Sequence, residues 1–214
     1  PIVSKEIKTK YPMIVRFFPL ILFAISVLAY GMFLPWLGYY EDEWTAIYNV
    51  TIGQTGESLK ADRPFAGLVW GYFALVLGSK PLAWHLFALL TKWLSATIFW
   101  MMLRAIWPKN FGAITAITFL FLLHPGILQE SRAFVFGFFW LQLALIFLSF
   151  TIMVRVVREP KHRIIFTAIS VLCVSPTWFM NEYFIGLEAL RPIVLWKIIL
   201  ERGSRVNSRY YLSI

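Results

Sequence analysis

Three consecutive acidic residues, Glu41, Asp42 and Glu43, directly follow a long uncharged apolar stretch. Repulsion between adjacent carboxylates and partial burial both raise carboxyl pKa values. A carboxylate tuned in this way acts as a general base when it lies within hydrogen-bond reach of the proton that it removes. The alternative is an interfacial loop with solvated acids, in which aromatic neighbours such as Trp44 anchor the chain among lipid headgroups. Residue types alone leave both interpretations open.

Further charged residues in the later polar segments could complete a site with these acids. An arginine guanidinium is suited to bidentate recognition of phosphate, so acids and arginines on one membrane face predict a site for a phosphorylated, lipid-linked substrate. Taken singly, a charge of this kind is more often simply one at a helix end among lipid headgroups. The candidates for substrate binding are Asp62, Arg63, Glu130, Arg132 and Glu182.

Two ionisable residues, His85 and Lys92, lie within an apolar stretch. They are seven residues apart and therefore share one face of a helix predicted over 81–103. Ionisable groups inside a membrane are costly and usually face the protein interior or a water-filled cavity, so we predict that both contribute to substrate binding. His85 is also close enough to the segment end to reach the interface. A second internal pair, Glu188 and Arg191 at i and i+3, is interpreted as structural.

The composition requires a membrane setting for these residues. The 214-residue chain is 59% hydrophobic and only 14% charged, with a mean hydropathy of +0.70, well outside the range of soluble domains. Uncharged or nearly uncharged stretches of about 20 residues predict membrane-spanning helices. We therefore predict an all-α polytopic membrane bundle of about six transmembrane helices, over 17–40, 81–103, 111–129, 133–154, 164–181 and 183–200.

The apolar segment 65–79 is too short to be a seventh span. With a cytoplasmic N-terminus and six spans, most Lys and Arg residues fall on the cytoplasmic side, as the positive-inside rule requires. A crossing by 65–79 would move most of them outside. We therefore predict a short interfacial helix here, within an outer loop over 41–80. In this topology the outer face receives the acids at positions 41–43, 57, 62, 130 and 182. The positive-inside rule concerns Lys and Arg, so it does not require acids on that face.

Composition also bears on partners and chain organisation. The net charge is +9, but the basic residues follow the predicted cytoplasmic loops rather than one binding face, which argues against a nucleic-acid partner. Cys173 is the sole cysteine, so the chain has no internal disulfide. We expect residues 1–214 to form a single transmembrane domain, and the first residue, Pro1, suggests the N-terminal part of a longer protein.

This layout resembles the GT-C superfamily of membrane glycosyltransferases, in particular protein O-mannosyltransferases and aminoarabinose transferases. The first outer loop of those enzymes begins just after the first span with an acidic pair, as Asp42 and Glu43 do in "YYEDEW". A Pro-containing segment before the surface helix resembles "DRPF", and an Arg element near the fourth span resembles "ESRAFVFGFFW" with Arg132. The similarity covers roughly the first two-thirds of the chain.

The resemblance implies transfer of a sugar from a polyprenyl-phosphate donor to an acceptor on the outer face of the cytoplasmic membrane. It assigns Asp42 as the base, with Glu43 beside it, and makes Arg63 and Arg132 candidates to hold the donor phosphate. It leaves open a divalent cation as cofactor. Two other functions are also compatible with the sequence: a non-catalytic membrane subunit of a larger complex that retains this fold, and a small transporter whose path Lys92 and His85 line.

Overall fold

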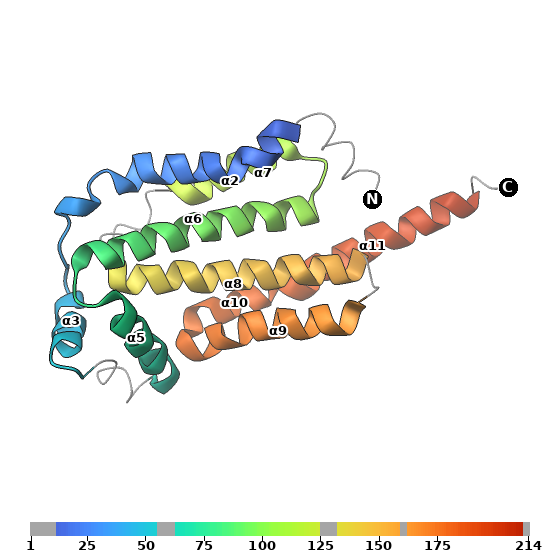
Figure 1. The fold of residues 1–214 in the computed structure, drawn as a ribbon. Coiled ribbons are helices and arrows are strands. Elements are labelled where there is room, and N and C mark those ends of the chain that lie inside the picture. The colour runs from blue at the N-terminus through green and yellow to red at the C-terminus, as the bar shows by residue number, and fades with distance from the viewer. Residues whose placement is uncertain (1–11, 55–62, 125–131, 159–161, 212–214) are drawn as a thin grey trace.

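The computed structural model describes residues 12–54, 63–124, 132–158 and 162–211, and every regular element among them is helical. The predicted all-α fold is thus confirmed for this part of the chain. The elements are arranged around a bundle of long helices (Figure 1). In chain order they are α2 (Pro12–Ser26), the π-helical turn η1 (Val27–Gly31), the 3₁₀ turn η2 (Leu34–Trp36), α3 (Glu43–Thr51), α5 (Pro64–Leu77), α6 (Pro81–Ile106), α7 (Phe111–Leu123), α8 (Ala133–Arg158), α9 (Arg163–Met180), η4 (Glu182–Phe184), α10 (Ile185–Glu188) and α11 (Leu190–Tyr211).

Four helical segments in the described ranges have the length and composition needed to cross a membrane. Three coincide closely with the predicted spans over 81–103, 133–154 and 164–181. The first was predicted over 17–40, but it begins earlier and ends at Trp36, because the backbone from Leu37 to Tyr40 is not helical. The four segments are Met13–Trp36, Pro81–Ile106, Ala133–Arg158 and Arg163–Met180.

The predicted span over 183–200 is divided in the structure. A helical turn ends at Glu188, and α11 begins again at Leu190. Pro192 explains the division, because a proline lacks the N–H that would bond to the carbonyl four residues earlier and its ring clashes with that carbonyl, here that of Glu188. Proline is tolerated in the first turn of the restarted helix, where Pro192 lies.

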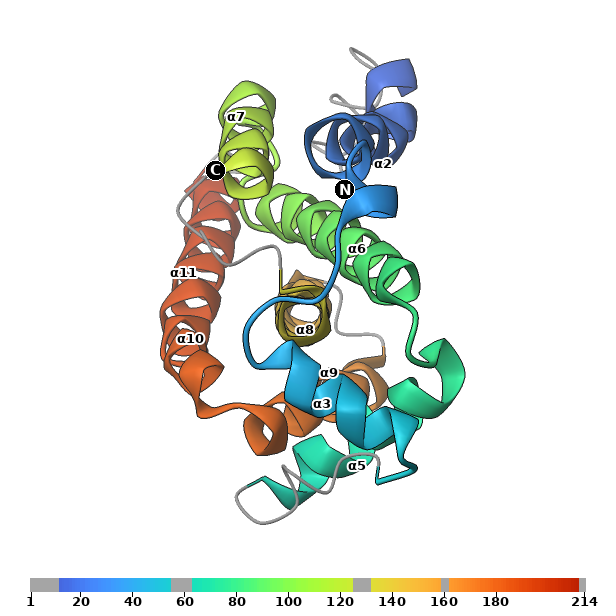
Figure 2. The same cartoon turned by 90° about the vertical axis from the view of Figure 1, so that its left-hand side faces the viewer.

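Two shorter apolar helices complete the bundle. The 13 residues of α7 extend for about 20 Å, and the rest of the predicted span over 111–129 lies largely outside the described residues. Helix α5, predicted over 65–79, has 14 residues and ends before Gly78, whose φ of 66° suits glycine. It lies oblique to α6 and α8 (Figures 1 and 2) and packs Trp70 and Phe73 against Phe138 of α8.

Helices α6 and α8 form the centre of the bundle. At Gly137 an added Cβ would lie 2.6 Å from the Phe87 ring, so the absence of a side chain there permits the close approach of the two helices. Around this contact Trp84, Phe134 and Phe138 are buried in an aromatic cluster. A second buried cluster of aliphatic and aromatic residues comes from α2, α6, α7, α8, α9 and α11.

Large apolar side chains also cover the outside of the long helices. A solvated surface rarely carries so continuous an apolar covering, whereas lipid-facing helices require it. The helices therefore have the character of a multi-pass membrane protein. Examples of exposed residues are Leu20, Leu28, Leu120, Ile164, Leu172 and Ile193.

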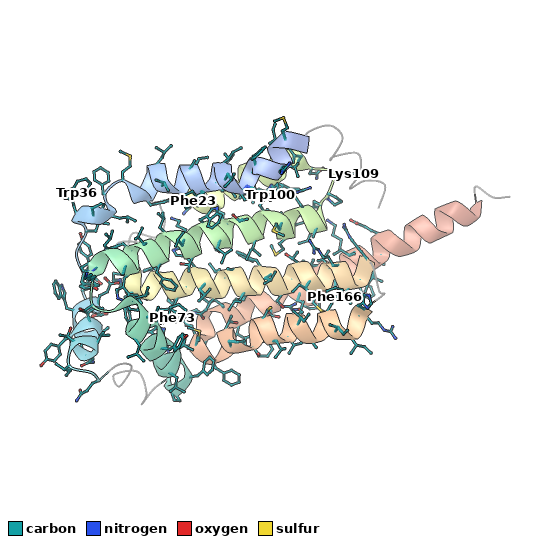
Figure 3. The ribbon with its side chains drawn as sticks, in the orientation of Figure 1. Phe23, Trp36, Phe73, Trp100, Lys109 and Phe166 are labelled. Atoms are coloured by element: carbon teal, nitrogen blue, oxygen red, sulfur yellow. The ribbon has the colours of Figure 1, made fainter. Side chains whose placement is uncertain are left out.

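The two ends of the bundle differ in charge. We call the end with α3 and Trp36 the acidic end (Figures 1 and 3). Its described charged residues lie at the starts of α3, α5, α6 and α8 or just after α9, and they are Glu41, Asp42, Glu43, Arg63, Lys80, Arg132 and Glu182. The opposite end, which we call the basic end, includes Lys109 (Figure 3) and the last turns of α6 and α8. Its basic residues include Arg104, Lys109, Arg155, Arg158 and Arg163.

Candidate functional site

The three consecutive acids have different environments. Glu41 adopts a φ of 51°, in the left-handed region that residues other than glycine rarely occupy. The chain turns here from the non-helical segment after Trp36 into α3, with hydrogen bonds from Glu43 N–H to Tyr40 O and from Trp44 N–H to Glu41 O. As a result Glu41 and Asp42 are exposed, whereas the Glu43 side chain is buried.

Glu43 binds the beginning of α8. Its carboxylate accepts hydrogen bonds from the backbone N–H of Phe134 and, at 3.3 Å, from that of Tyr40. The first N–H groups of a helix have no partner within the helix, so Glu43 caps α8 from a distance of 91 residues in the chain. Burial raises the pKa of the Glu43 carboxyl, while the N–H groups of Phe134, Tyr40 and Val135 and the charge of Arg132 lower it in part.

The neighbouring Tyr39 has a buried hydroxyl with no hydrogen-bond partner among the described residues. Burial, together with the nearby Glu43 charge, raises the pKa of this phenol above its ordinary value. Tyr39 therefore stays neutral and packs edge-on against Trp44, with ring centroids 5.7 Å apart. Nothing in the local sequence pattern indicated that Tyr39 would be buried.

Arg132 joins the first and second polar segments of the acidic end. Its Nη1 lies 3.0 Å from Oε2 of Glu41 and 3.8 Å from Oδ2 of Asp42, and its side chain is only 15% exposed. The Asp42 side chain is 89% exposed and does not cap α3, although Asp42 occupies the N-cap position. The structure thus places an accessible carboxylate, that of Asp42, beside the largely buried guanidinium of Arg132; both residues are candidates from the sequence.

Arg63 and Glu182 join the first and third polar segments. Arg63 Nη2 donates to Glu182 Oε1 at 2.7 Å, across 119 residues, and the guanidinium lies 6.0 Å from the centre of the Tyr183 ring. Both charged side chains are substantially exposed, so the pair contributes little to stability. The remaining two predicted residues of this end, Asp62 and Glu130, lie outside the described residues.

His85 and Lys92 line one partly open cavity, in agreement with the shared helix face that the sequence predicted. The cavity has a volume of about 350 Å³ and lies between the first span, α6 and α8. His85 Nε2 lies 2.9 Å from the carbonyl oxygen of Gly38, to which it donates in one tautomer. The Lys92 ammonium lies 3.4 Å from the centre of the Tyr30 ring and 5.1 Å from that of Trp140, an arrangement that stabilises a cation through the ring faces.

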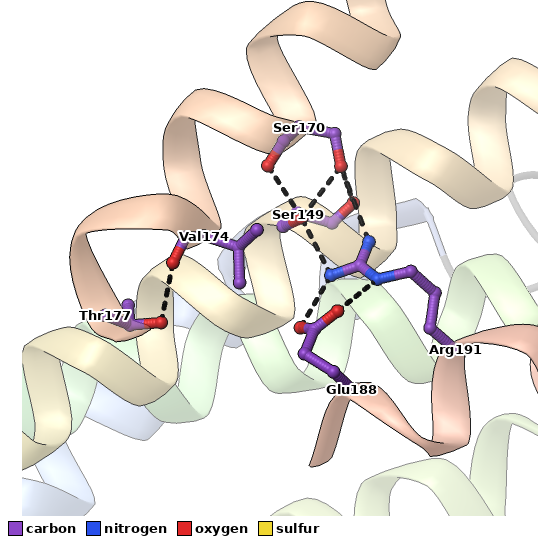
Figure 4. Close-up of polar contacts among 6 residues, drawn as sticks. All are labelled: Ser149, Ser170, Val174, Thr177, Glu188 and Arg191. Carbon is purple, nitrogen blue, oxygen red and sulfur yellow. Dashed lines mark hydrogen bonds and ion pairs between the residues drawn. The ribbon is translucent and has the colours of Figure 1, made fainter. Parts of the chain in front are cut away.

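A second polar cluster joins α8, α9, α10 and α11 (Figure 4). Arg191 donates to both carboxylate oxygens of Glu188, at 2.6 and 2.8 Å, and its Nη2 lies 3.0 Å from Ser149 Oγ. Ser149 and Ser170 also contact each other through their hydroxyls at 2.7 Å. The residue spacing predicted the pair but not the serines, which lie on helices distant in the sequence.

The described residues hold no group of three or more His, Cys, Asp or Glu side chains that could bind a metal ion. Comparisons with protein-family models, curated proteins and solved structures found no match to this chain. Within the part of the chain that the structure describes, the candidate site consists of Asp42 with Glu41 and Arg132, supported by Glu43, and of the adjacent cavity with His85 and Lys92.

Proposed function

We propose that this protein is a membrane glycosyltransferase of the GT-C type, which transfers a sugar from a polyprenyl-phosphate donor to an acceptor hydroxyl at the acidic end of the bundle. In this proposal the basic end faces the cytoplasm and the acidic end faces outward, in agreement with the positive-inside rule. The first span, α6, α7, α8, α9 and the α10–α11 region cross the membrane, and α5 lies along its outer surface.

The observation that supports this function best is the contact between Arg132 and the acids before α3. Residues from two polar segments, about 90 positions apart in the sequence, meet at 3.0 and 3.8 Å. If Arg132 only formed a structural ion pair, one carboxylate would be enough. Here Glu41 makes the shorter contact with Arg132, and the Asp42 side chain stays exposed. Asp42 is therefore positioned by a neighbouring charge while it remains accessible to an acceptor.

The reaction would use Asp42 as the general base. The acceptor oxygen attacks the anomeric carbon, and the bond from that carbon to the phosphate oxygen breaks. Asp42 takes the acceptor proton, and the polyprenyl phosphate leaves with the bonding electron pair. Glu43, which sequence reasoning also assigned to catalysis, is a positioning residue in this scheme, because its carboxylate is buried against backbone N–H groups of α8.

The test is sugar transfer by the purified chain in lipid vesicles, with radiolabelled polyprenyl-phosphate sugars as donors. Asp42→Asn should reduce transfer by about 10²-fold or more, the usual contribution of a general base. Glu201→Gln is the control, since it removes a carboxylate of α11 that lies outside the candidate site and should retain most of the activity. Full activity of Asp42→Asn would reject the assignment. Absence of transfer by the unaltered chain, together with a stoichiometric co-purified membrane protein, would favour the subunit alternative.

A further inference from the structure

A second cavity lies between α8 and the turn η4, and the described residues that line it present only apolar surface. Its volume is about 310 Å³, at the lower end of the usual range for small-molecule sites. On α8 the lining residues are spaced at i, i+3, i+4 and i+7, so they share one face of that helix. We call this cavity the aromatic slot; its lining residues are Phe136, Phe139, Trp140, Leu143, Tyr183 and Phe184.

The aromatic slot begins near the acidic end of the bundle and follows α8 inward. Phe136 lies three residues and Leu143 ten residues after the first residue of α8, which places them about 5 and about 15 Å from the helix start. The hydrocarbon core of a bilayer is about 30 Å thick. A ligand that fills the slot therefore lies along the helix, inside the apolar half of the membrane that is next to the acidic end.

Both walls of the aromatic slot are fixed by contacts within the protein. Phe136 is buried, and the Phe139 ring packs edge-on against Phe184, with ring centroids 5.7 Å apart. The turn η4 is capped by the buried Asn181, whose side chain accepts a hydrogen bond from the Tyr183 N–H at 3.3 Å. The slot is thus formed before a ligand enters, which lowers the cost of ordering side chains on binding.

Two guanidinium groups lie beside rings that line the aromatic slot. The guanidinium of Arg132 is 5.9 Å from the centre of the Phe136 ring, and that of Arg63 is 6.0 Å from the centre of the Tyr183 ring. The slot therefore combines an apolar interior with positive charge at the acidic end. This arrangement complements a ligand that has an apolar chain and an anionic head.

Arg63 is the guanidinium that can exchange its partner. Its ion pair with Glu182 joins side chains that are 37% and 60% exposed, and such pairs contribute at most about 1 kcal/mol. A phosphate carries more charge than a carboxylate, and guanidinium binds it with bidentate geometry, so a phosphate can replace Glu182 on Arg63. The Arg132 side chain, in contrast, is only 15% exposed and is held by Glu41 and Asp42.

We infer that the aromatic slot binds the isoprenoid tail of a lipid phosphate, whose phosphate replaces Glu182 as the partner of Arg63. The allylic C–H groups of an isoprenoid carry partial positive charge and suit the negative faces of aromatic rings. This inference deepens the proposed function and rests on it for the identity of the lipid. It gives uncharged residues such as Phe139 and Tyr183 a role in substrate binding that the sequence did not indicate.

The head group can be tested by binding alone. The full chain in phosphatidylcholine nanodiscs would be titrated calorimetrically with farnesyl phosphate, with empty nanodiscs as the blank. We expect Arg63→Gln to weaken binding by about 10- to 100-fold, as loss of a hydrogen bond to a charged group does. Glu182→Gln should instead tighten it by up to about 5-fold, because the competing ion pair is lost. Lys80→Gln is the control, since Lys80 is an exposed cation of the acidic end that does not line the slot.

The tail requires variants of its own. Leu143→Trp places a larger side chain in the aromatic slot and should weaken farnesyl phosphate binding by about 10-fold, as overpacking of a filled site does. Leu120→Trp, at an exposed position of α7 that does not line the slot, is the matched control. Where Leu143→Trp does not fold, Tyr183→Ser removes one wall at a position that is 69% exposed and should also weaken binding.

Three further ligands test the chemistry of the tail and the head. Dodecyl phosphate has a saturated chain of the same length, farnesol lacks the phosphate, and inorganic phosphate lacks the tail, so each should bind more weakly than farnesyl phosphate. Equally tight binding of any of the three overturns the inference. Unchanged binding of farnesyl phosphate in Arg63→Gln or in a folded Leu143→Trp or Tyr183→Ser variant, or weaker binding in Glu182→Gln, also overturns it.

The outcomes for the aromatic slot and for the proposed function are distinguishable, because no sugar transfer is measured in the binding experiment. Binding that depends on Leu143 and Arg63, in a chain that transfers no sugar from any donor, would reject the glycosyltransferase and leave the lipid site. Transfer that depends on Asp42, with farnesyl phosphate binding unaffected by Leu143→Trp, would reject the lipid site and leave the transferase.

Discussion

The carboxylate of Glu43 accepts a hydrogen bond from the backbone N–H of Phe134, in the first turn of α8. This contact fixes the segment before α3 to the central helix of the bundle. The two exposed acids that precede Glu43 are thereby held beside Arg132, the residue immediately before α8. One buried carboxylate therefore determines where its two neighbours lie.

Glu43→Ala should destabilise the protein by about 2 kcal/mol, because it leaves buried N–H groups of Phe134 and Tyr40 without an acceptor. Glu182→Ala, in the exposed pair with Arg63, should change stability by less than about 1 kcal/mol. Unfolding in mixed detergent, followed by tryptophan fluorescence, would measure both. Equal stability of the two variants would show that Glu43 does not hold α8.

The stability contributed by Glu43 should depend on pH. Burial raises the pKa of this carboxyl in the folded protein, so the folded state binds more protons than the unfolded state in the window between the two pKa values. The contribution is fully present below the ordinary glutamate pKa and is lost as pH rises through the raised pKa. The unaltered protein should therefore gain stability relative to Glu43→Gln as pH falls from about 7 to about 4. Thermal unfolding of both proteins across this range measures the difference, and parallel curves would contradict it.

Removal of one member of the Arg191–Glu188 pair should cost more than removal of both. Arg191→Met leaves the Glu188 carboxylate without its two guanidinium hydrogen bonds in a site where both side chains are largely covered, at a cost of about 3 kcal/mol. The double variant Glu188→Leu/Arg191→Met removes both charges and should recover part of that loss. A double-mutant cycle by detergent unfolding gives the coupling, and additive losses would show that the pair is not coupled.

Gly137→Ala should disturb the contact between α6 and α8. The added methyl would lie 2.6 Å from the Phe87 ring, and overpacking of this kind usually costs about 1–3 kcal/mol. Gly112→Ala is the matched control, because a Cβ there meets no atom within 4 Å and alanine favours a helix over glycine. Melting temperatures of the two variants should shift in opposite directions. A melting temperature unchanged by Gly137→Ala would mean that the Phe87 ring rotates away at little cost.

Local patterns predicted the long helices well, because a long uninterrupted apolar stretch in a membrane has few conformations other than a helix that satisfy its backbone hydrogen bonds. The segments 81–106, 133–158 and 163–180 agree with their predictions within a few residues. The division at Ala189 was missed, although Pro192 is visible in the sequence, because the apolar pattern continues through it. The end of the first span was misplaced for a similar reason, since Leu37 and Tyr40 are as apolar as the helix before them.

The candidate site was predictable in its membership but not in its geometry. Their shared helix face placed His85 and Lys92 together, whereas the charged loops only named Asp42 and Arg132 as candidates. The different roles of Asp42 and Glu43 depend on which carboxylate points toward α8. That direction follows from the left-handed turn at Glu41 and from the position of Phe134. Neither feature can be predicted from the residues next to Glu43 in the sequence. Ser149 and Ser170 were missed for the same reason, because their roles arise only when α8 and α9 pack together.

The serine pair bears on how the protein is made. Ser149 and Ser170 each donate to the other's backbone carbonyl, at 2.8 and 3.0 Å, so the α8–α9 hairpin can satisfy these buried hydroxyls by itself. Arg191 leaves the ribosome after both serines, and an arginine entering the bilayer without partners is costly. The α8–α9 hairpin thus supplies hydrogen-bonding partners for the Arg191 guanidinium from residues that precede α11 in the sequence.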